Sequence, residues 1–419
     1  MIFDSVSFLK NMVQEAIDAV DPLKVVPAFL PEKPKGRVIV IGAGKASAAM
    51  AKAVEQSWPD VDMQGIVVTR YGYGVLTDKI EIIEASHPVP DEAGRQACTK
   101  ILNLLKMLTE DDLVLCLISG GGSALLSFPA PCLSFEEKQG INNALLRSGA
   151  TIHEMNCLRK HLSSIKGGQL ALAAHPAKIK TLIISDVPGD NPATVASGPT
   201  LPDPTTQAQA MEVVKKYDIP VYGAVITWLS DPKNETPKAD HLCFKEVDVQ
   251  IVSSAKHSLA AAEKYARAQG IETIILGDDI EGESSIVAQE QVQKAGSIKP
   301  EQMTVFLSGG ETTVTIKGEG GKGGPNTEFI LSSLIEADGQ KNIYGIAVDT
   351  DGIDGSEDNA GAFFTPETLK TAKEKNLEAQ KYLAANNSYS FFKDIDGLVM
   401  TGPTYTNVND FRAIMVLPV

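Results

Sequence analysis

The sequence predicts an α/β protein with two domains, the first of them built on a doubly wound parallel sheet. Apolar runs of strand length alternate with helical patterns over the first half of the chain, an order that is typical of parallel sheets. At 419 residues the chain is also too long for a single hydrophobic core. We therefore expect one domain over residues 1–235 and a smaller α/β domain over 236–419, joined at the polar segment 231–237.

Each expected element begins and ends where the apolar period changes or where turn residues gather. In the first domain we expect strands at 37–42, 65–69, 80–84, 113–118 and 179–185. The helices expected there are 1–20, 45–57, 94–108, 135–148, 152–161 and 168–174, with helical patterns over 207–229. In the second domain we expect strands at 247–252, 273–276, 304–307, 343–348 and 413–417, and helices between the first two strands and at 284–293. Residues 187–206 are rich in proline and glycine, and a loop of this length is usually functional.

The composition narrows the range of partners. The net charge is −15, and no long basic stretch interrupts it, which argues against nucleic acid and anionic membranes as partners. No apolar run of about 18 residues indicates a transmembrane helix. The five cysteines are scattered without a CxxC pair, as in reduced cytoplasmic proteins. We expect a cytoplasmic protein with a small-molecule substrate, and a homodimer is the assembly that we consider.

Two glycine-rich segments follow apolar runs and are the main candidates for ligand binding. The first comprises Ser119, Gly120, Gly121, Gly122 and Ser123; if a helix follows it, the helix N–H groups would favour an anion. The second repeats the pattern at Ser308, Gly309, Gly310, Glu311 and Thr312. We expect the two segments to form opposite walls of one site.

A third turn, Gly42 to Ser47 with the sequence GAGKAS, lies between an expected strand and helix. It approaches the dinucleotide-binding pattern G-x-G-x-x-G, but an ordinary tight turn is an equally good interpretation. The next strand ends at Arg70 instead of an acid, which weakens an NAD site. Gly44 would bring the backbone close to a ligand, and Lys45 would meet a phosphate or carboxylate.

Charged residues in other segments complete the candidate site. Arg159 and Lys166 could hold an anion, although a solvated basic helix end is an equal alternative. Asp186 and Asp190 follow an expected strand, where α/β proteins bind ligands, and could accept a proton from a hydroxyl. The lone histidines show no ligand spacing and are expected to be structural.

The acids after residue 348 and a glycine run upstream of them suggest a metal and a phosphate. Asp349, Asp351 and Asp354 do not follow the spacing of a calcium loop, but three acids at a strand end suit a Mg²⁺ that also touches phosphates. Residues 318–328 form a glycine-rich run before a helical pattern, and we expect a lid or phosphate loop there that includes Asn326 and Glu328.

Together these motifs resemble the class II glycerate kinases, the glycerate 2-kinase family with a C-terminal MOFRL domain, whose members are often labelled hydroxypyruvate reductase. The resemblance covers nearly the whole chain. It rests on the motifs GAGKAS (42–47), ASHPVPDEAG (85–94), ISGGGSALL (118–126), RKHLSSIKGGQLA (159–171), SDVPGDNPATVASGPT (185–200), LSGGETTVT (307–315), DTDGIDGSEDNAGA (349–362) and TGPTYTNVND (401–410).

The resemblance implies a Rossmann-like N-terminal domain, a smaller MOFRL-type domain and an active site in the cleft between them. It also implies ATP-dependent, Mg²⁺-requiring phosphorylation of the 2-hydroxyl of D-glycerate or a related hydroxy acid. By motif, Lys45 matches the family's catalytic lysine and Asp351 its MOFRL-domain aspartate, while Asp186 and Asp190 match its paired acids.

The chain departs from the family's pattern at two positions. Pro325 stands where the motif GGRNQE has an arginine, so a guanidinium that could stabilise the transferring phosphoryl group is missing. Lys322 could replace it only as a point charge. Tyr405 stands where TGPTGTNV has a glycine. Two alternatives to the kinase are therefore kept, an NAD(P)H-dependent hydroxypyruvate reductase and a non-catalytic sensor of sugar acids.

Overall fold

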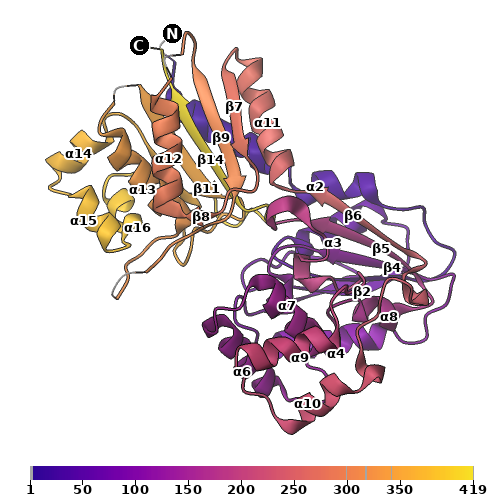
Figure 1. The fold of residues 1–419 in the computed structure, drawn as a ribbon. Helices are drawn as coiled ribbons and strands as arrows, with labels where there is room; N and C mark the ends of the chain where they lie inside the picture. Colours follow the sequence, from indigo (N-terminus) through magenta and orange to yellow (C-terminus); the bar gives the residue numbers. More distant parts are fainter. Residues whose placement is uncertain (1–2, 299, 317–318, 341, 419) are drawn as a thin grey trace. The chain divides into compact units, whose positions relative to one another are not determined.

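The computed structural model describes residues 3–298, 300–316, 319–340 and 342–418 (Figure 1). The chain folds into two compact units. The first unit comprises residues 1–25, 186–190 and 253–419, and the second comprises 26–185 and 191–252. Gly318, the first residue of the expected glycine run, lies outside the described residues.

The second unit is organised around a six-stranded sheet with the strand order β3-β2-β1-β4-β5-β6. Its strands are β1 (Val38–Ala43), β2 (Met63–Arg70), β3 (Ile80–Ala85), β4 (Leu113–Ile118), β5 (Lys178–Ile184) and β6 (Val247–Ser253). The pairs from β3 to β5 are parallel. Every residue of β1 and β4 is buried, which explains why both strands are continuous apolar runs. This strand order is that of the Rossmann fold, so the predicted fold class is confirmed.

Helices cover this sheet and form a smaller helical group beside it (Figure 1). They are α3 (Ser47–Ser57), α4 (Glu92–Leu104), α5 (Gly122–Leu125), α6 (Phe135–Arg147), α7 (Ile152–His161), α8 (Gln169–Ala174), α9 (Gln207–Lys216) and α10 (Gly223–Ser230). Helices α6, α7 and α9 each begin with a capping box, as at Ser134 and Glu137. Leu145, Leu158 and Val213 join these helices in one core.

The first unit contains a mixed sheet with the order β13-β12-β11-β14-β9-β7. Its strands are β7 (Glu272–Gly277), β9 (Thr304–Gly310), β11 (Ile343–Asp349), β12 (Gly361–Phe364), β13 (Leu398–Val399) and β14 (Asp410–Val416); β8 (Gly282–Glu283) and β10 (Thr312–Thr313) pair separately. Its helices are α1 (Ser5–Asp18), α2 (Pro22–Val25), α11 (Ala255–Ala268), α12 (Ser284–Gly296), α13 (Pro325–Ala337), α14 (Thr368–Glu374), α15 (Ala379–Ala384) and α16 (Ser388–Asp394).

Strand β14 shows how both faces of the second sheet are covered. Ile414 and Val416 belong to the core that contains α12 and α13. Phe411, Ala413 and Met415 belong to the core that contains α1 and α11. Because successive side chains of a strand point to opposite faces, this division explains why the run from Ala413 to Val416 is apolar on both faces.

The units do not coincide with the expected division at residues 235 and 236. Strand β6, expected in the second domain, lies beside β5 in the first sheet, and Ile179 N donates to Glu246 O at 2.9 Å. Helix α1, expected in the first domain, packs instead on the C-terminal sheet, where Phe8 stacks on Tyr265. The pattern of α1 predicts an amphipathic helix correctly, but an apolar stripe does not specify which of two sheets it covers.

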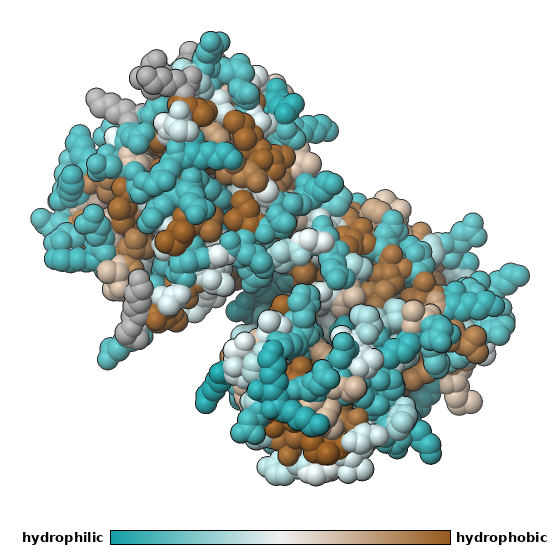
Figure 2. Space-filling view, viewed as in Figure 1, coloured by the Kyte–Doolittle hydropathy of each residue, from teal (hydrophilic) through white to brown (hydrophobic). Residues whose placement is uncertain are grey.

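Hydrophilic side chains are spread over the surface of both units in the view of Figure 2, with apolar side chains in separate groups between them. Within the described residues, no helix has both the length and the apolar character that a membrane span requires.

Candidate active site

The carboxyl ends of β1 and β4 bring two of the predicted segments into contact. Lys45 N donates to Gly120 O at 2.8 Å, and Ala46 N donates to Ser119 Oγ at 3.0 Å. Ser47 and Ser119 share a hydrogen bond between their hydroxyl groups at 3.1 Å. In the order β3-β2-β1-β4-β5-β6, the direction of winding reverses between β1 and β4. Open α/β sheets bind ligands beside the carboxyl ends of the strands at this switch point.

Two glycines permit this close approach of the two turns. Gly44 has a φ of +143°, and a Cβ there would lie 2.1 Å from Ser119 Oγ. Gly121 has a φ of +81°. The helix expected after the glycines is only the single turn α5, so the expected anion site at a helix N-terminus is wrong. The segment therefore acts through its shape and through neighbouring side chains.

The backbone N–H groups of the GAGKAS turn are already used inside the protein. The amide of Gly44 donates to Val68 O at 3.1 Å, and that of Ser47 donates to Gly44 O at 3.2 Å. Those of Lys45 and Ala46 donate to the glycine segment, as described above. A dinucleotide pyrophosphate needs such amides as donors, so this turn can offer an anion the Lys45 side chain but not a backbone cradle.

A group of cations lies behind the first glycine segment. The Lys166 ammonium donates to Ser123 O at 2.6 Å and to Leu126 O at 3.0 Å, and burial lowers its pKa to about 7. Because this side chain is only 3% exposed, we assign it the role of holding the segment in place rather than direct ligand contact. The buried Lys138 ammonium donates to Phe128 O at 3.0 Å.

Arg159 is the member of this group that remains available to a ligand. Its side chain is half-buried, and its buried Nε has no hydrogen-bond partner among the described residues. Desolvation lowers its pKa. The charges of Lys138, Lys166 and Arg159 repel one another. An anion near Arg159 would relieve this repulsion.

The proline-rich loop packs directly on the first glycine segment. Ser123 and Ser197 share a hydrogen bond between their hydroxyl groups at 2.8 Å, and a Cβ on Gly122 would lie 2.7 Å from the Cβ of Ala196. Ala196 and Ser197 both have left-handed backbone conformations, with φ of 51° and 63°. Such conformations are unfavourable outside glycine and are concentrated at functional sites. The prediction that this loop is functional therefore gains structural support.

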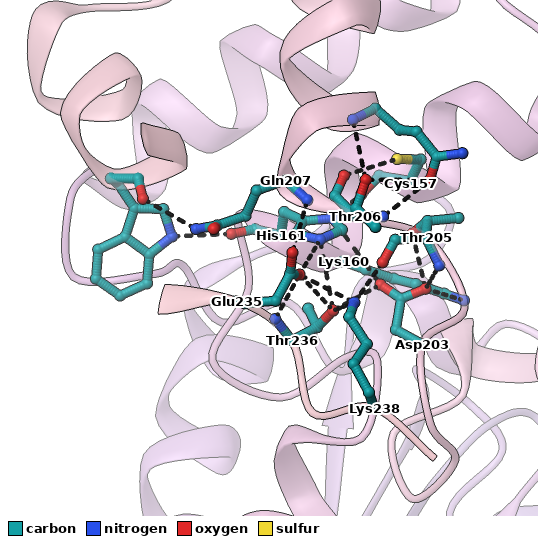
Figure 3. A network of polar contacts seen from close by, with 12 residues as sticks. Cys157, Lys160, His161, Asp203, Thr205, Thr206, Gln207, Glu235, Thr236 and Lys238 are labelled. Atoms are coloured by element: carbon teal, nitrogen blue, oxygen red, sulfur yellow. Dashed lines mark hydrogen bonds and ion pairs between the residues drawn. The ribbon is translucent and has the colours of Figure 1, made fainter. Parts of the chain in front are cut away.

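A polar network fixes the motif that carries Arg159 (Figure 3). His161 donates from Nδ1 to Cys157 O and from Nε2 to Glu235 Oε1, each at 2.8 Å. Lys160 pairs with Asp203 at 3.5 Å. The network joins α7 to segments 203–207 and 235–238, and it gives His161 a structural role inside the basic motif.

The first unit brings other predicted residues together. Asn407 Nδ2 donates to Asp186 Oδ2 at 3.2 Å, and the Asn409 side chain donates to the Asp186 carbonyl. Thr350 Oγ1 in turn donates to Asn409 O at 2.7 Å. Asp186 therefore lies beside the acidic segment that follows β11. Asp190 lies four residues further on with a φ of 52°.

Asp349 and Asp351 form a pair at the carboxyl end of β11. Asp349 Oδ1 accepts from Asp351 N at 2.9 Å, and Asp351 Oδ1 accepts from Ile353 N at 2.8 Å. Asp354 does not join them, so the expectation of three acids at one metal ion is wrong. Across the part of the chain that the structure describes, no three His, Cys, Asp or Glu side chains gather around a metal position. Two carboxylates still suit a Mg²⁺ that also binds phosphates.

The second Ser-Gly-Gly segment is part of a strand, and its expected role as a wall of the site stays a prediction. Ser308, Gly309 and Gly310 continue strand β9. The Ser308 hydroxyl is buried and donates to Gln291 Oε1 at 3.0 Å. The buried guanidinium of Arg412 donates to Gly309 O at 3.1 Å and to Gly310 O at 3.3 Å.

The two residues after this segment differ in exposure. Thr312 is buried and its amide donates to Asp410 Oδ2 at 3.3 Å, whereas Glu311 is exposed. Thr312 is therefore used inside the protein, and of the five predicted residues only Glu311 presents its side chain to solvent.

The start of α13 is closed by a carboxylate of the protein itself. Asp354 accepts from Asn326 N at 2.9 Å and from Thr327 N at 2.8 Å. Burial raises the pKa of Asp354 to about 6. Pro325 occupies the first position of the helix, where its missing N–H costs nothing. The Asp354 carboxylate thus occupies the position that a phosphate would need at the start of α13, which does not favour the phosphate loop expected here.

Two further residues predicted to bind ligand near α13 are committed to internal contacts. The Asn326 amide donates to Asp410 Oδ1 at 2.6 Å, and Glu328 Oε2 accepts from Asn386 Nδ2 at 3.1 Å. Their side chains are buried, with exposed fractions of 1% and 4%. Nearby Lys322 pairs with Glu357 at 3.2 Å and so is not a free substitute for the family's arginine.

His87, one of the lone histidines expected to be structural, lies at the first glycine segment. Its ring atoms Cδ2 and Nε2 lie 3.0 and 3.1 Å from the point that a Cβ on Gly121 would take. Lys45 Cγ lies 3.6 Å from the same point. His87 lies within the motif ASHPVPDEAG, and this motif is the sequence signal that could have pointed to it.

A Rossmann-type sheet with a lysine and a glycine segment at its switch point defines an α/β protein that binds small anionic ligands there. Comparison with known proteins is more specific. Residues 8–230 match a domain of unknown function, DUF4147, and residues 304–410 match the MOFRL family. A relative from Agrobacterium vitis, provisionally named hydroxypyruvate reductase, is 48% identical over 97% of this chain and 94% of its own.

Two further comparisons concern Thermotoga maritima. Its D-glycerate 2-kinase is 38% identical over 98% of both chains. A crystal structure of glycerate kinase from the same organism aligns with a TM-score of 0.89 at 36% identity, covering 98% of this chain and 99% of the other. The chain belongs to the glycerate 2-kinase family with a MOFRL domain.

Proposed function

We propose that this protein transfers the γ-phosphoryl group of ATP to the 2-hydroxyl of D-glycerate and so forms 2-phosphoglycerate. The observation that carries the proposal is the similarity, over nearly the full length of both chains, to a D-glycerate 2-kinase. The position of Lys45 at the switch point supports it, because phosphoryl transfer depends on placed positive charge. A cytoplasmic location and a homodimer remain predictions from the sequence.

The residues of the second unit would handle the anionic parts of the ligands. Lys45 would contact the transferring phosphoryl group, and the segment from Ser119 to Ser123 would shape the surface beside it. Arg159 would meet the glycerate carboxylate, since its guanidinium suits a planar anion and lacks a carboxylate partner among the described residues. Lys166 would keep the segment in position through Ser123 O.

The acids of the first unit would handle the proton and the metal. Asp186 or Asp190 would accept the proton that leaves the 2-hydroxyl. Asp349 and Asp351 would hold Mg²⁺, which when bound neutralises charge on the nucleotide phosphates. Asp351 is fully buried and fixed by Ile353 N, so its carboxylate has a defined orientation.

The reductase is the second candidate because of the name given to the Agrobacterium vitis relative. A nicotinamide dinucleotide would need donors in the GAGKAS turn, whose amides are already bonded inside the protein. It would also need a partner for its ribose after β2, where this chain has Arg70, which suits only a 2′-phosphate. These features favour the kinase.

A coupled assay of ADP release tests the proposal. Purified protein with ATP, Mg²⁺ and D-glycerate is expected to release ADP well above a blank without glycerate. The matched assay follows oxidation of NADPH and NADH by hydroxypyruvate, and we expect none. ADP release equal to the blank would contradict the kinase, and hydroxypyruvate-dependent oxidation would establish the reductase.

A further inference from the structure

His87 lies at the switch point although it follows a strand at the edge of the sheet. Strand β3 ends at Ala85, and β2 and β1 separate it from β4. The ring nevertheless packs on Gly121, which follows β4. The segment after β3 and the glycine segment that leads into α5 therefore meet over the carboxyl edge of the sheet.

Contacts on both sides hold the segment that follows β3, residues 86–94. The Asp91 carboxylate accepts from Gly94 N at 3.1 Å, which caps α4, and from Tyr71 Oη at 2.9 Å. The Gln139 side chain donates to Pro90 O at 2.8 Å. A Cβ on Gly94 would lie 3.0 Å from Leu125 O, so the start of α4 packs on the end of the glycine segment. These contacts fix the backbone that carries the His87 imidazole.

The imidazole and Lys45 flank the same glycine. Both approach the place where a side chain on Gly121 would stand, the ring at 3.0 Å and the lysine stem at 3.6 Å. The His87 ring, through Nε2, and the stem of Lys45 therefore border the same position at the switch point. An imidazole carries at least one N–H in either protonation state, so it can donate to an oxyanion at any working pH. Preorganised donors of this kind stabilise charge in transition states.

We propose that His87 is a catalytic residue whose ring N–H donates to an oxygen of the transferring phosphoryl group beside Lys45. This inference rests on the proposed kinase function. The bond between the γ-phosphorus and the bridging oxygen of ADP breaks, and a bond to the substrate hydroxyl oxygen forms. The hydroxyl proton leaves to a carboxylate or to solvent. The histidine keeps its proton and forms no covalent bond.

Substitutions at His87 test the donor role. His87→Ala is expected to lower kcat about 100-fold, the size of effect known for losing one oxyanion donor. The KM for D-glycerate should change less than about threefold, because the contact is made to the phosphoryl group. His87→Gln keeps an N–H donor and should recover most of the loss. The matched control is His153→Ala, an exposed histidine at the start of α7.

A second measurement does not depend on turnover. The ring nitrogen NMR signals of the wild-type protein are recorded with and without ADP, vanadate and D-glycerate, and His87→Gln assigns the signal. We expect the His87 signal to shift on addition and that of His153 to stay. A kcat of His87→Ala within about twofold of wild type, or a His87 signal that does not move, would overturn the inference and leave the kinase intact. A wild-type protein that does not phosphorylate glycerate would overturn both.

Discussion

The two Ser-Gly-Gly segments have nearly the same sequence but opposite structural roles. After Ser119 the chain leaves β4 and turns at the open carboxyl edge of a parallel sheet, next to Lys45. After Ser308 the chain continues β9, and Arg412 donates to the carbonyls of both glycines. The neighbours of a segment, rather than its own residues, decide whether its glycines face a ligand or the interior. The first segment is therefore the candidate for phosphoryl handling and the second for structure.

Loss of the lysine beside the first segment should have the largest effect. Lys45→Met is expected to lower kcat about 1000-fold, because a cation at the transferring phosphoryl group is typically worth this much. The melting temperature should stay near that of wild type. Lys52→Met, on the same helix α3, is the matched control and should keep full activity. If Lys45→Met were as active as wild type, the proposed catalytic role of Lys45 and the first segment would be contradicted.

Gly121→Ala tests the first segment directly. The new Cβ would approach the His87 ring at 3.0 Å in a backbone conformation of φ +81°, so the ring or the lysine stem must move. We expect kcat to fall about 10- to 100-fold, as for displaced oxyanion donors, while stability falls by about 1 to 2 kcal/mol. Steady-state kinetics and thermal unfolding of the same preparation measure both. A loss of stability without a fall in kcat would show that the first segment, like the second, has a structural and not a catalytic role.

Gly310→Ala should show the reverse pattern. Its Cβ would lie 2.3 Å from Ile280 N, a backbone atom that cannot swing away, and φ is +103°. We expect a loss of about 2 to 4 kcal/mol in the free energy of unfolding from strain and overpacking. The kcat of the folded fraction should remain within about threefold of wild type. Urea unfolding curves give the first quantity, and kinetics at a temperature well below the melting point give the second. A large loss of kcat with normal stability would show that the second segment is part of the active site.

The network around His161 predicts how the unit that carries the first segment responds to acid. Although burial alone would raise it, hydrogen bonds from Gln207 N, Lys238 and His161 lower the pKa of Glu235 to about 2. A lowered folded-state pKa gives stability that is fully present above the unfolded value near 4.5 and is lost as the pH falls toward 2. In Glu235→Gln this pH dependence should flatten, and stability at pH 7 should already be reduced. An unchanged slope between pH 4.5 and 2 would contradict the assigned network.

Pro325→Arg should have the smallest effect. The residue is at the first position of α13, where Asp354 caps the following amides, so the change should alter stability by less than about 1 kcal/mol. We expect kcat to rise by no more than severalfold, because catalysis is assigned mainly to the first segment. A rise of 100-fold or more, measured by ADP release, would show that the start of α13 is the dominant site of charge stabilisation.

The fold could be predicted from the sequence more completely than the site. The buried runs Val38–Ala43 and Leu113–Ile118 identify central parallel strands because both of their faces are covered. The position of α1 could not be predicted, since its apolar stripe fits either sheet. Tyr405 stands where the family's motif TGPTGTNV has a glycine, and the structure does not explain the tyrosine. Its φ is 59°, a conformation that favours the glycine found in related chains.

The site was harder to predict because its residues are far apart in the sequence. His87 shows no ligand spacing with another histidine or cysteine in the chain, and only the fold brings it to Gly121. Ser308 has the same local pattern as Ser119, whereas its burial depends on Gln291 and Arg412 from other elements. Local patterns therefore identified the glycine segments but could not distinguish a ligand-facing turn from a strand end.

The position of the new phosphate on the product tests the central claim most directly. Wild-type protein is incubated with ATP, Mg²⁺ and D-glycerate, and the products are followed by phosphorus NMR, with enolase added to consume only 2-phosphoglycerate. We expect one phosphoglycerate signal that disappears on addition of enolase, together with an equal amount of ADP. A signal that persists with enolase, or the absence of any phosphoglycerate, would contradict the assignment of this chain as a glycerate 2-kinase.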